Sequence, residues 1–481
     1  MKKDLLARQA PRLSLGLTVL VLCNLAFAAD WSRFHGADGN GVSPDKQPTP
    51  TKWSESENLK WKAKLPGPGS SSPIVIGNRV VVTCWSGYGA DPAHEGEEAD
   101  LRRHVVCLDR DTGKVLWDRV VEPVLPEDPY AGQFTQHGYA SHTPVSDGKQ
   151  IYVFFGKTGV LAFNLEGKKL WQTSVGTGSG SHGWGTASSP ILYKNLVIVP
   201  ASAESESLVA LSQETGKEVW RYKDRGFTSV WGTPVLVDCG HDRTDLVIAV
   251  PNKVLGFDPE TGKLQWYCDG LNSDSICTSA IAGDGIVYAL ETGPRGGGNI
   301  AVRAGGEGDV SKTHILWRST EKSRIVTPIL DNKRIYFVNG RVASCLDADS
   351  GKTIYRVSLT GGPIPPDMSP SGPRPGGQRP GGPRPDGKQP GGQRPGGGGR
   401  GPMGGEYSSP VLADGKIYFL SRSGDAFVYN VGAEFKLLAQ NHFASGSGDF
   451  SSTPAISDGQ LFIRSSKFLY CVAKPGSAKP D

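Results

Sequence analysis

Short apolar runs dominate the chain, and each run is bounded by residues that favour turns. The stretch SSPIVIGNRVVVTC at 71–84 shows the pattern, with a β-branched run, a Gly-Asn turn and a second β-branched run. Such runs are typical of β-strands, whereas apolar residues at the period of a helix are scarce. The pattern predicts an all-β protein with many short strands.

A unit of four strands repeats along the chain. Each unit opens with a strand after Ser-Pro or Thr-Pro, and later reaches a Thr-Gly-Lys turn and a fourth strand near a tryptophan. The openings lie at Pro73, Pro144, Pro190, Pro234, Ala280, Pro328, Pro410 and Pro454. The tryptophan-like positions are Trp61, Trp117, Trp171, Trp220, Trp266, Trp317, Tyr355 and Leu438. Four antiparallel strands every ~40–50 residues are typical of propeller blades, so eight blades are predicted.

The two sets of positions are offset from each other. Trp61 comes before the first opening at Pro73, and no tryptophan follows the last opening at Pro454. We therefore expect residues 59–65 to form the outer strand of the last blade, which closes the ring and leaves no exposed seam. The prediction is one eight-bladed β-propeller over 59–474, with an N-terminal extension at 29–58 and a tail at 475–481.

The phrase DTGKVLW at 111–117 returns as ETGKEVW at 214–220 and ETGKLQW at 260–266. Its glycine suits the positive-φ position of a tight turn. Its tryptophan is expected to wedge against the neighbouring blade, where a large buried ring stabilises the stack. The predicted docking residues are Trp61, Trp117, Trp171, Trp220, Trp266, Trp317 and Tyr355.

These phrases, such as CLDRDTGKVLW and ALSQETGKEVW, resemble the tryptophan-docking motif of the pyrroloquinoline quinone (PQQ) dehydrogenases, which are eight-bladed propellers. The same repeat occurs in non-enzymatic relatives, including the propeller lipoprotein of the outer-membrane assembly machinery. The opening DWSRFHGADGNG at 30–41 is similar to exported bacterial PQQ-like propellers. The resemblance implies the fold, while function depends on the site that a fold carries.

The first 28 residues have the features of a secretory signal peptide. Four basic residues precede an apolar run, and Ala26-Phe27-Ala28 provides a small-residue cleavage site before Ala29. No later run reaches the ~20 apolar residues that a membrane span needs. We expect an exported protein of the periplasm or cell exterior, without a transmembrane segment.

Charge and composition add two expectations. The net charge is only +4, and no basic face is visible, so a nucleic-acid partner is not predicted. The Gly/Pro/Arg-rich segment 361–405 cannot bury a core and is expected to be disordered. It is a spacer, or alternatively it attracts an acidic envelope polymer weakly. We expect a monomer.

Seven cysteines follow the predicted signal peptide. Cys107, Cys345 and Cys471 occupy equivalent strand positions and are expected to be small buried hydrophobic residues. Cys268 and Cys277 are close in sequence and could form a disulfide in an oxidising compartment. There is no CxxC pair, so metal or haem binding by cysteine is not supported.

The segments that enter the innermost strands should meet on one face around the centre of the ring. We call this face the loop mouth. It brings together His137, Tyr139, His142, His182, Trp184, Trp231, Asp274, Arg324, Glu406 and Asp449. Aromatic rings beside charged groups suit a planar or sugar-like ligand. The alternative is that these residues only satisfy loop backbone and pack blades together. Three of them are histidines, but their spacing is unspecific and no metal site is predicted.

The sequence favours a non-catalytic scaffold of the cell envelope that requires no cofactor and binds a ligand, polymer or protein. The alternative is a PQQ- and calcium-dependent alcohol or sugar dehydrogenase. The resemblance implies that such an enzyme needs adjacent cysteines, a stacking tryptophan, calcium ligands and an aspartate base. The chain has no adjacent cysteines, and no catalytic residue is assigned. A protein-interaction propeller would instead need an exposed patch on the loop face.

Overall fold

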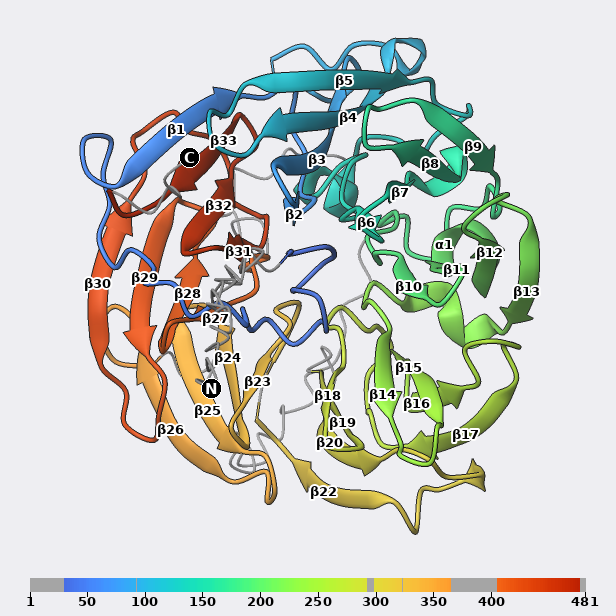
Figure 1. Cartoon of the computed structure of the whole chain (residues 1–481). Helices are drawn as coiled ribbons and strands as arrows, with labels where there is room; N and C mark the ends of the chain where they lie inside the picture. The colour runs from blue at the N-terminus through green and yellow to red at the C-terminus, as the bar shows by residue number, and fades with distance from the viewer. Residues whose placement is uncertain (1–29, 92, 292–297, 322, 365–404, 476–481) are drawn as a thin grey trace, which may run out of the picture.

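Eight four-stranded units surround a common centre (Figure 1). The computed structural model describes residues 30–91, 93–291, 298–321, 323–364 and 405–475. The predicted signal peptide, residues 365–404 of the insertion and residues 476–481 of the tail lie outside the described residues. The prediction of an all-β, eight-bladed propeller is confirmed.

Blades 1 to 4 follow one another in chain order. Their strands are β2 (Ile74–Ile76), β3 (Arg79–Ser86), β4 (Arg102–Asp109) and β5 (Val115–Val121); β6 (Val145–Ser146), β7 (Gln150–Phe154), β8 (Val160–Asn164) and β9 (Lys169–Thr173); β10 (Ile191–Tyr193), β11 (Leu196–Ala201), β12 (Ser207–Ser212) and β13 (Glu218–Lys223); and β14 (Val235–Asp238), β15 (Thr244–Val250), β16 (Lys253–Phe257) and β17 (Leu264–Asp269).

Blades 5 to 8 complete the ring. Their strands are β18 (Ile281–Gly283), β19 (Ile286–Glu291), β20 (Gly298–Arg303) and β22 (Ile315–Ser319); β23 (Ile329–Asp331), β24 (Arg334–Asn339), β25 (Val342–Asp347) and β26 (Thr353–Ser358); β27 (Val411–Ala413), β28 (Lys416–Leu420), β29 (Asp425–Asn430) and β30 (Leu437–His442); and β31 (Ala455–Ser457), β32 (Gln460–Arg464), β33 (Phe468–Val472) and β1 (Leu59–Lys64). The antiparallel pairing of β1 with β33 closes the ring between distant parts of the chain, as the offset predicts.

Helices are short within the described part of the chain. They are α1 (Ser202–Ser205) and the 3-10 helices η1 (Glu98–Asp100), η2 (Gly132–Gln136), η3 (Gly156–Thr158) and η4 (Arg225–Ser229). None of the helices described there has the length and apolar character needed to cross a membrane.

The middle strands are buried on both faces because each blade is packed between two others. All six central residues of β3 are buried, and Val81 shares a hydrophobic cluster with Ile151 of blade 2. Burial on two faces removes the need for alternating polar residues. This explains why the apolar runs in the sequence are nearly continuous.

A closed belt of hydrogen bonds joins the eight blades around the centre. The backbone N–H of one hydroxyl residue in each blade donates to the hydroxyl oxygen of its counterpart in the next blade, over N···O distances of 2.9–3.2 Å. The members of this hydroxyl belt are Ser72, Thr143, Ser189, Thr233, Ser279, Thr327, Ser409 and Thr453. Each precedes the Pro or Ala of the repeat opening, and a following proline favours extended backbone.

The Thr-Gly-Lys turns receive the outer tryptophans. The indole Nε1 of Trp220 donates to the carbonyl oxygen of Pro259 in blade 4 at 3.1 Å. Gly262 beside it has φ of 70°, and a Cβ there would lie 2.5 Å from the indole ring. The turn therefore needs glycine both for its backbone and for the approach of the ring. The same indole-to-carbonyl bond is made by Trp61, Trp117, Trp171 and Trp317.

Two of the predicted docking residues differ from this arrangement. Trp266 donates to Asp245 in its own blade at 2.6 Å, because the corresponding turn of blade 5 is replaced by β21 (Gly308–Asp309), which pairs with β17. The indole lies instead over Gly256, the small residue opposite it. Tyr355 contacts Phe435 of blade 7 with 5.8 Å between ring centroids, and its hydroxyl has no hydrogen-bond partner among the described residues.

The cysteines are free thiols in the described structure. Cys107, Cys345 and Cys471 lie in register with Trp117, Tyr355 and Trp61 of the adjacent outer strands. The equivalent positions in other blades are small residues such as Ala210, so these cysteines act as small packing residues under a large ring. Cys268 and Cys277 are also free, and the disulfide considered from the sequence is not formed.

The N-terminal segment 30–53 crosses the centre of the ring (Figure 1). Trp31 exchanges backbone hydrogen bonds with Val75 of blade 1, and Gly41 accepts one from Leu412 of blade 7. The buried His35 reaches the carbonyl oxygen of Pro410 at 3.0 Å. This segment therefore joins blades 1 and 7, which are not neighbours in the ring, and fills space between inner strands.

We expect the Thr233→Val substitution to lower the free energy of unfolding by about 1–3 kcal/mol, because it leaves the buried N–H of Ser189 without an acceptor. Urea denaturation measures this change. Thr215→Val in an exposed turn is the matched control and should stay within about 0.5 kcal/mol of the parent. Equal effects at the two positions would contradict a stabilising role for the hydroxyl belt.

Candidate functional site

Three aromatic rings form a partly exposed cluster at the loop mouth. Trp184 lies between His182 and Trp231, with centroid distances of 4.9 Å and 5.1 Å. His182 is exposed and both tryptophans are half-buried. We call these three residues the aromatic platform. Its rings pack against one another rather than enclosing a cage, so the platform offers a stacking surface to a ligand.

Neighbouring loops hold the platform in place. The indole Nε1 of Trp231 donates to the carbonyl oxygen of Gly185 at 2.9 Å, and His137 Nε2 donates to the carbonyl oxygen of Trp184 at 2.6 Å. The backbone N–H of Trp231 also donates to Ile276 at 2.7 Å. Burial lowers the pKa of His137, which suits a neutral ring that donates from Nε2 and accepts from Ser141 at Nδ1. The stacking surface is thus preorganised.

An arginine ties two sides of the mouth together. Arg422, which follows β28, donates to Asp449 from Nε at 2.8 Å and to the amide oxygen of Gln136 from Nη1 at 2.7 Å. Its backbone N–H donates to Glu406 at 2.7 Å, and its guanidinium lies over the ring of Tyr407. Burial raises the pKa of Glu406. Glu406 and Asp449, two of the three carboxylates predicted for the mouth, are therefore already engaged by protein groups.

Titratable side chains, most of them buried, gather behind the platform. They are Arg103, Glu127, Asp128, His142, Lys157 and Glu204, which line one cavity of about 20 Å³. We call these residues the buried charged cluster. Arg103 pairs with Glu127 at 2.7 Å, and Lys157 pairs with Asp128 at 2.8 Å. The cavity also contacts Gly185 and Thr186 of the platform loop.

The structure thus divides the ten predicted mouth residues between different environments. His182, Trp184 and Trp231 form the platform, whereas Glu406 and Asp449 contact Arg422. Tyr139 is buried and donates to the carbonyl oxygen of Asp128 at 2.6 Å, and His142 packs on Phe154. Asp274 and Arg324 are exposed.

The histidines do not converge. His137, His142 and His182 each have separate partners, and no group of three His, Cys, Asp or Glu side chains suited to a metal occurs among the described residues.

Several charged residues of the site were missed from the sequence. Glu204 and Arg422 follow second strands of blades 3 and 7, and Lys157 lies in the first turn after β7. Glu291 at the end of β19 is buried and accepts from the N–H groups of Cys277 and Thr278, and burial raises its pKa to about 7. A charged residue directly after a buried apolar strand is the signal that could have identified them.

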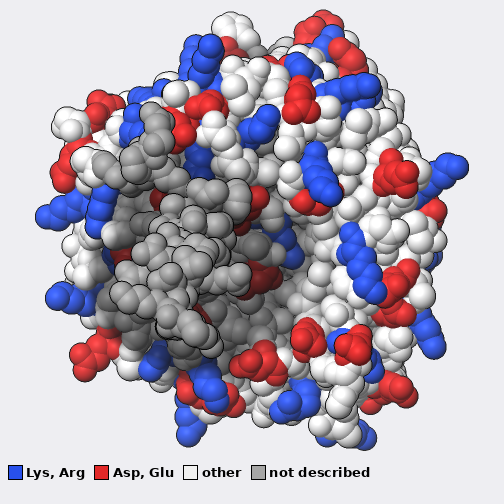
Figure 2. Space-filling model, viewed as in Figure 1, with Lys and Arg blue, Asp and Glu red and all other residues white. Residues whose placement is uncertain are grey.

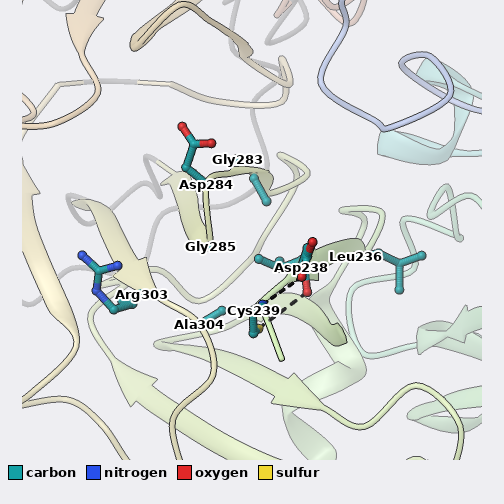
Figure 3. Close-up of a pocket in the computed structure, with 11 residues that line it drawn as sticks. Leu236, Asp238, Cys239, Gly283, Asp284, Gly285, Arg303 and Ala304 are labelled. Atoms are coloured by element: carbon teal, nitrogen blue, oxygen red, sulfur yellow. Dashed lines mark hydrogen bonds between the residues drawn. The ribbon is translucent and has the colours of Figure 1, made fainter. Parts of the chain in front are cut away.

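A second hollow lies between blades 4 and 5 (Figure 3). This groove of about 540 Å³ has Leu236, Asp238 and Cys239 on the blade 4 side, and Asp284 and Arg303 on the blade 5 side. It lies at the interface where no outer tryptophan docks on the next blade, because Trp266 donates to Asp245 within blade 4. Its charged side chains are exposed, and none of the described side chains lining it is a buried polar group without a partner. The loop mouth is the better-formed candidate site.

Comparison with known proteins agrees with this fold. Residues 24–182 and 101–356 match the profile of a family described as outer membrane protein assembly factor BamB, which is more than half of the chain. The chain belongs to this family. The resemblance to the PQQ-repeat propellers predicted from the docking phrases is thereby confirmed.

Relatives of two kinds match the chain. Outer membrane protein assembly factor BamB of Yersinia pestis is 27% identical over 56% of this chain and 65% of its own length. Polyvinylalcohol dehydrogenase of Sphingopyxis sp. (strain 113P3) is 23% identical over 52% of this chain and 41% of its own length. The matched region therefore spans less than two thirds of either relative.

Among solved structures, quinohemoprotein alcohol dehydrogenase from Comamonas testosteroni superposes with a TM-score of 0.59 at 11% identity, over 95% of this chain and 82% of that chain. This likeness concerns the propeller fold.

The resemblance implies that the dehydrogenases hold a quinone and a calcium ion. The residues of the loop mouth do not fit these two groups. Trp184 and Trp231 pack on each other, and Asp449 is paired with Arg422. Each of the described cysteines is a separate free thiol, so none provides the adjacent pair that the resemblance requires. We therefore derive no reaction step through these groups.

The Arg422→Met variant should lower the free energy of unfolding by about 1–3 kcal/mol, because it leaves Asp449 and the amide oxygen of Gln136 without their partner. Urea denaturation provides the measurement. Arg341→Met removes an ion pair with Asp425 whose arginine is more exposed than Arg422 and should cost less than about 1 kcal/mol. If the Arg341 variant is the less stable one, Arg422 does not hold the mouth together.

Proposed function

We propose that this protein is an exported, non-catalytic scaffold of the cell envelope whose loop mouth binds a ligand or partner on the aromatic platform. The aromatic platform is the main support for this proposal. The centroid of its central ring lies 4.9–5.1 Å from those of the other two, the rings are partly exposed, and hydrogen bonds from neighbouring loops hold them in place. Rigid aromatic side chains supply contact area at a low entropic cost. A protein, a polymer or a small molecule with a planar or ring-shaped group would suit this surface.

Other features support a scaffold. The expected signal peptide directs the chain to the envelope, and a relative carries the name of an outer membrane protein assembly factor. Acidic and basic side chains are interspersed over the described residues on the face shown in Figure 2, so charge does not single out a nucleic acid as partner. A monomer would place a single loop mouth on each molecule.

Photo-crosslinking in cells tests the proposed binding face. A photo-reactive amino acid in place of Trp184 is expected to give a discrete adduct with an envelope component. The same residue in place of Val219, which is 52% exposed on β13, is the control and should give none. Adducts at 219 alone would move the binding surface to the outer strands and reject the mouth.

Trp184→Ala should weaken binding of the component identified in this way by at least about tenfold, because it removes the central ring of the platform. Calorimetric titration measures this loss. The variant should remain folded by circular dichroism, since Trp184 is half-buried. Unchanged affinity would show that the platform is not the contact surface.

The alternative of a dehydrogenase is tested separately. The purified protein is titrated with PQQ with and without calcium, and dye reduction is followed with alcohols and sugars. We expect neither calcium-dependent binding nor turnover, because Asp449 is paired with Arg422 and the chain lacks adjacent cysteines. Tight binding with turnover would replace the scaffold proposal by an enzyme.

A further inference from the structure

The buried charged cluster joins three blades behind the platform. Arg103 comes from β4 and Lys157 from η3, while Glu204 lies in α1 of blade 3. Glu127, Asp128 and His142 come from the long segment 122–144 that leads from blade 1 to blade 2. The cavity between them has about 20 Å³, which is room for one water molecule.

The charges of the cluster balance only if Glu204 is neutral. The side chains of Arg103 and Glu127 are 3% and 5% exposed, and those of Lys157 and Asp128 are 9% and 14% exposed, so each pair is internally compensated. Glu204 is 5% exposed, and no ion pair to a cation is described for it. Its ionisation would add one uncompensated negative charge near two carboxylates, and an unpaired buried charge is costly.

Burial outweighs the polar contacts of Glu204. Its Oε2 has no hydrogen-bond partner among the described protein atoms, and its contacts with Thr186 and with its own backbone favour the ionised form less than the loss of solvation disfavours it. Burial raises the pKa of Glu204 to about 8 and lowers the pKa of His142 to about 3. His142 is therefore neutral as well and supplies no compensating charge.

Glu204 is linked to the mouth through two segments. Its partner Thr186 lies two residues after Trp184 of the platform and contacts His142 Nε2 at 3.3 Å. Arg103 and Lys157 hold the 122–144 segment through the carbonyl groups of Tyr139 and Pro126. That segment also carries His137, which holds Trp184, and Gln136, which bonds Arg422.

We propose that the buried charged cluster is a proton-binding site that controls the loop mouth. With Glu204 protonated, the two ion pairs hold the 122–144 segment and the platform in the arrangement described. With Glu204 ionised, the added negative charge repels Glu127 and Asp128 of that segment, weakens the hold of the two ion pairs on it and loosens the platform. The mouth then passes from an ordered to a looser state as pH rises.

The direction of the effect follows from proton linkage. The folded protein binds this proton more tightly than the unfolded chain, because its pKa in the folded state is about 8 and that of an exposed Glu is near 4.3. The stability that this proton adds to the folded protein is fully present below the pKa that Glu204 has in the unfolded chain. It is lost as pH rises to about 8. Above that pH the contribution no longer changes.

Hydrogen-exchange mass spectrometry of segments 127–142 and 181–187 tests the proposal. At pH 9 the amide hydrogens of these two segments should exchange several-fold faster in the parent than in Glu204→Gln, whose side chain has the shape of neutral glutamic acid. At pH 6.5 the exchange rates of the two proteins should match. Comparing proteins at the same pH removes the intrinsic pH dependence of exchange. Glu214→Gln, at an exposed turn of blade 3, is the control and should follow the parent.

Equal exchange of the parent and Glu204→Gln at pH 9 would overturn the proposal. Infrared spectra of the parent and of Glu204→Gln give a second answer, because subtracting one from the other removes the carboxyl band of Glu291, whose pKa is also raised to about 7. A protonated carboxyl band present at pH 6.5 should disappear by pH 9, and its absence at pH 6.5 would also overturn the proposal. Neither measurement uses a mouth ligand, so both outcomes are independent of the proposed scaffold function.

Discussion

The closed belt of eight hydroxyl hydrogen bonds is the constraint on which the rest of the structure depends. Each bond uses a backbone N–H of one blade and a hydroxyl of the next, so the inner ends of all blades keep one mutual spacing. The outer ends are held by indole-to-carbonyl bonds such as that of Trp220. Fixing both ends of a blade limits its rotation, and the apolar strands between them then pack on both faces.

The loop mouth is built directly on this belt. Trp231 precedes the belt residue Thr233 by two positions, and Asp449 lies four positions before Thr453. Side chains so close to fixed backbone are presented in defined directions, which suits a binding surface. The 122–144 segment adds a second layer, because it brings Gln136 to Arg422 and charged groups to the cavity behind the platform.

The interface between blades 4 and 5 shows what happens when one fixing point is replaced. Trp266 turns into its own blade, where its indole donates to Asp245, which also accepts from Arg243 and from the backbone N–H of Gly305. The short strand β21 then extends blade 4 at its outer edge. The groove of Figure 3 lies at the same junction, so a local change in the repeat has altered the surface without opening the ring.

The sequence by itself determined the number of blades, the closing strand and the positions of most docking tryptophans. These features depend on local signals: β-branched runs, turn glycines and the Ser/Thr-Pro openings repeat at every blade and act over a few residues. The sequence also indicated that Trp184 and Trp231 would share one face. It did not indicate that they stack, because their contact joins two blades.

Only the tertiary structure decided the charged parts of the site. Arg422 meets Gln136 across 286 positions of sequence, His35 meets Pro410 across 375, and Glu204 shares a cavity with residues of four other segments. No local pattern specifies such partners, since each depends on how distant loops settle once the ring is closed. The protonation of Glu204 likewise follows from burial beside charges that fold into place from elsewhere in the chain.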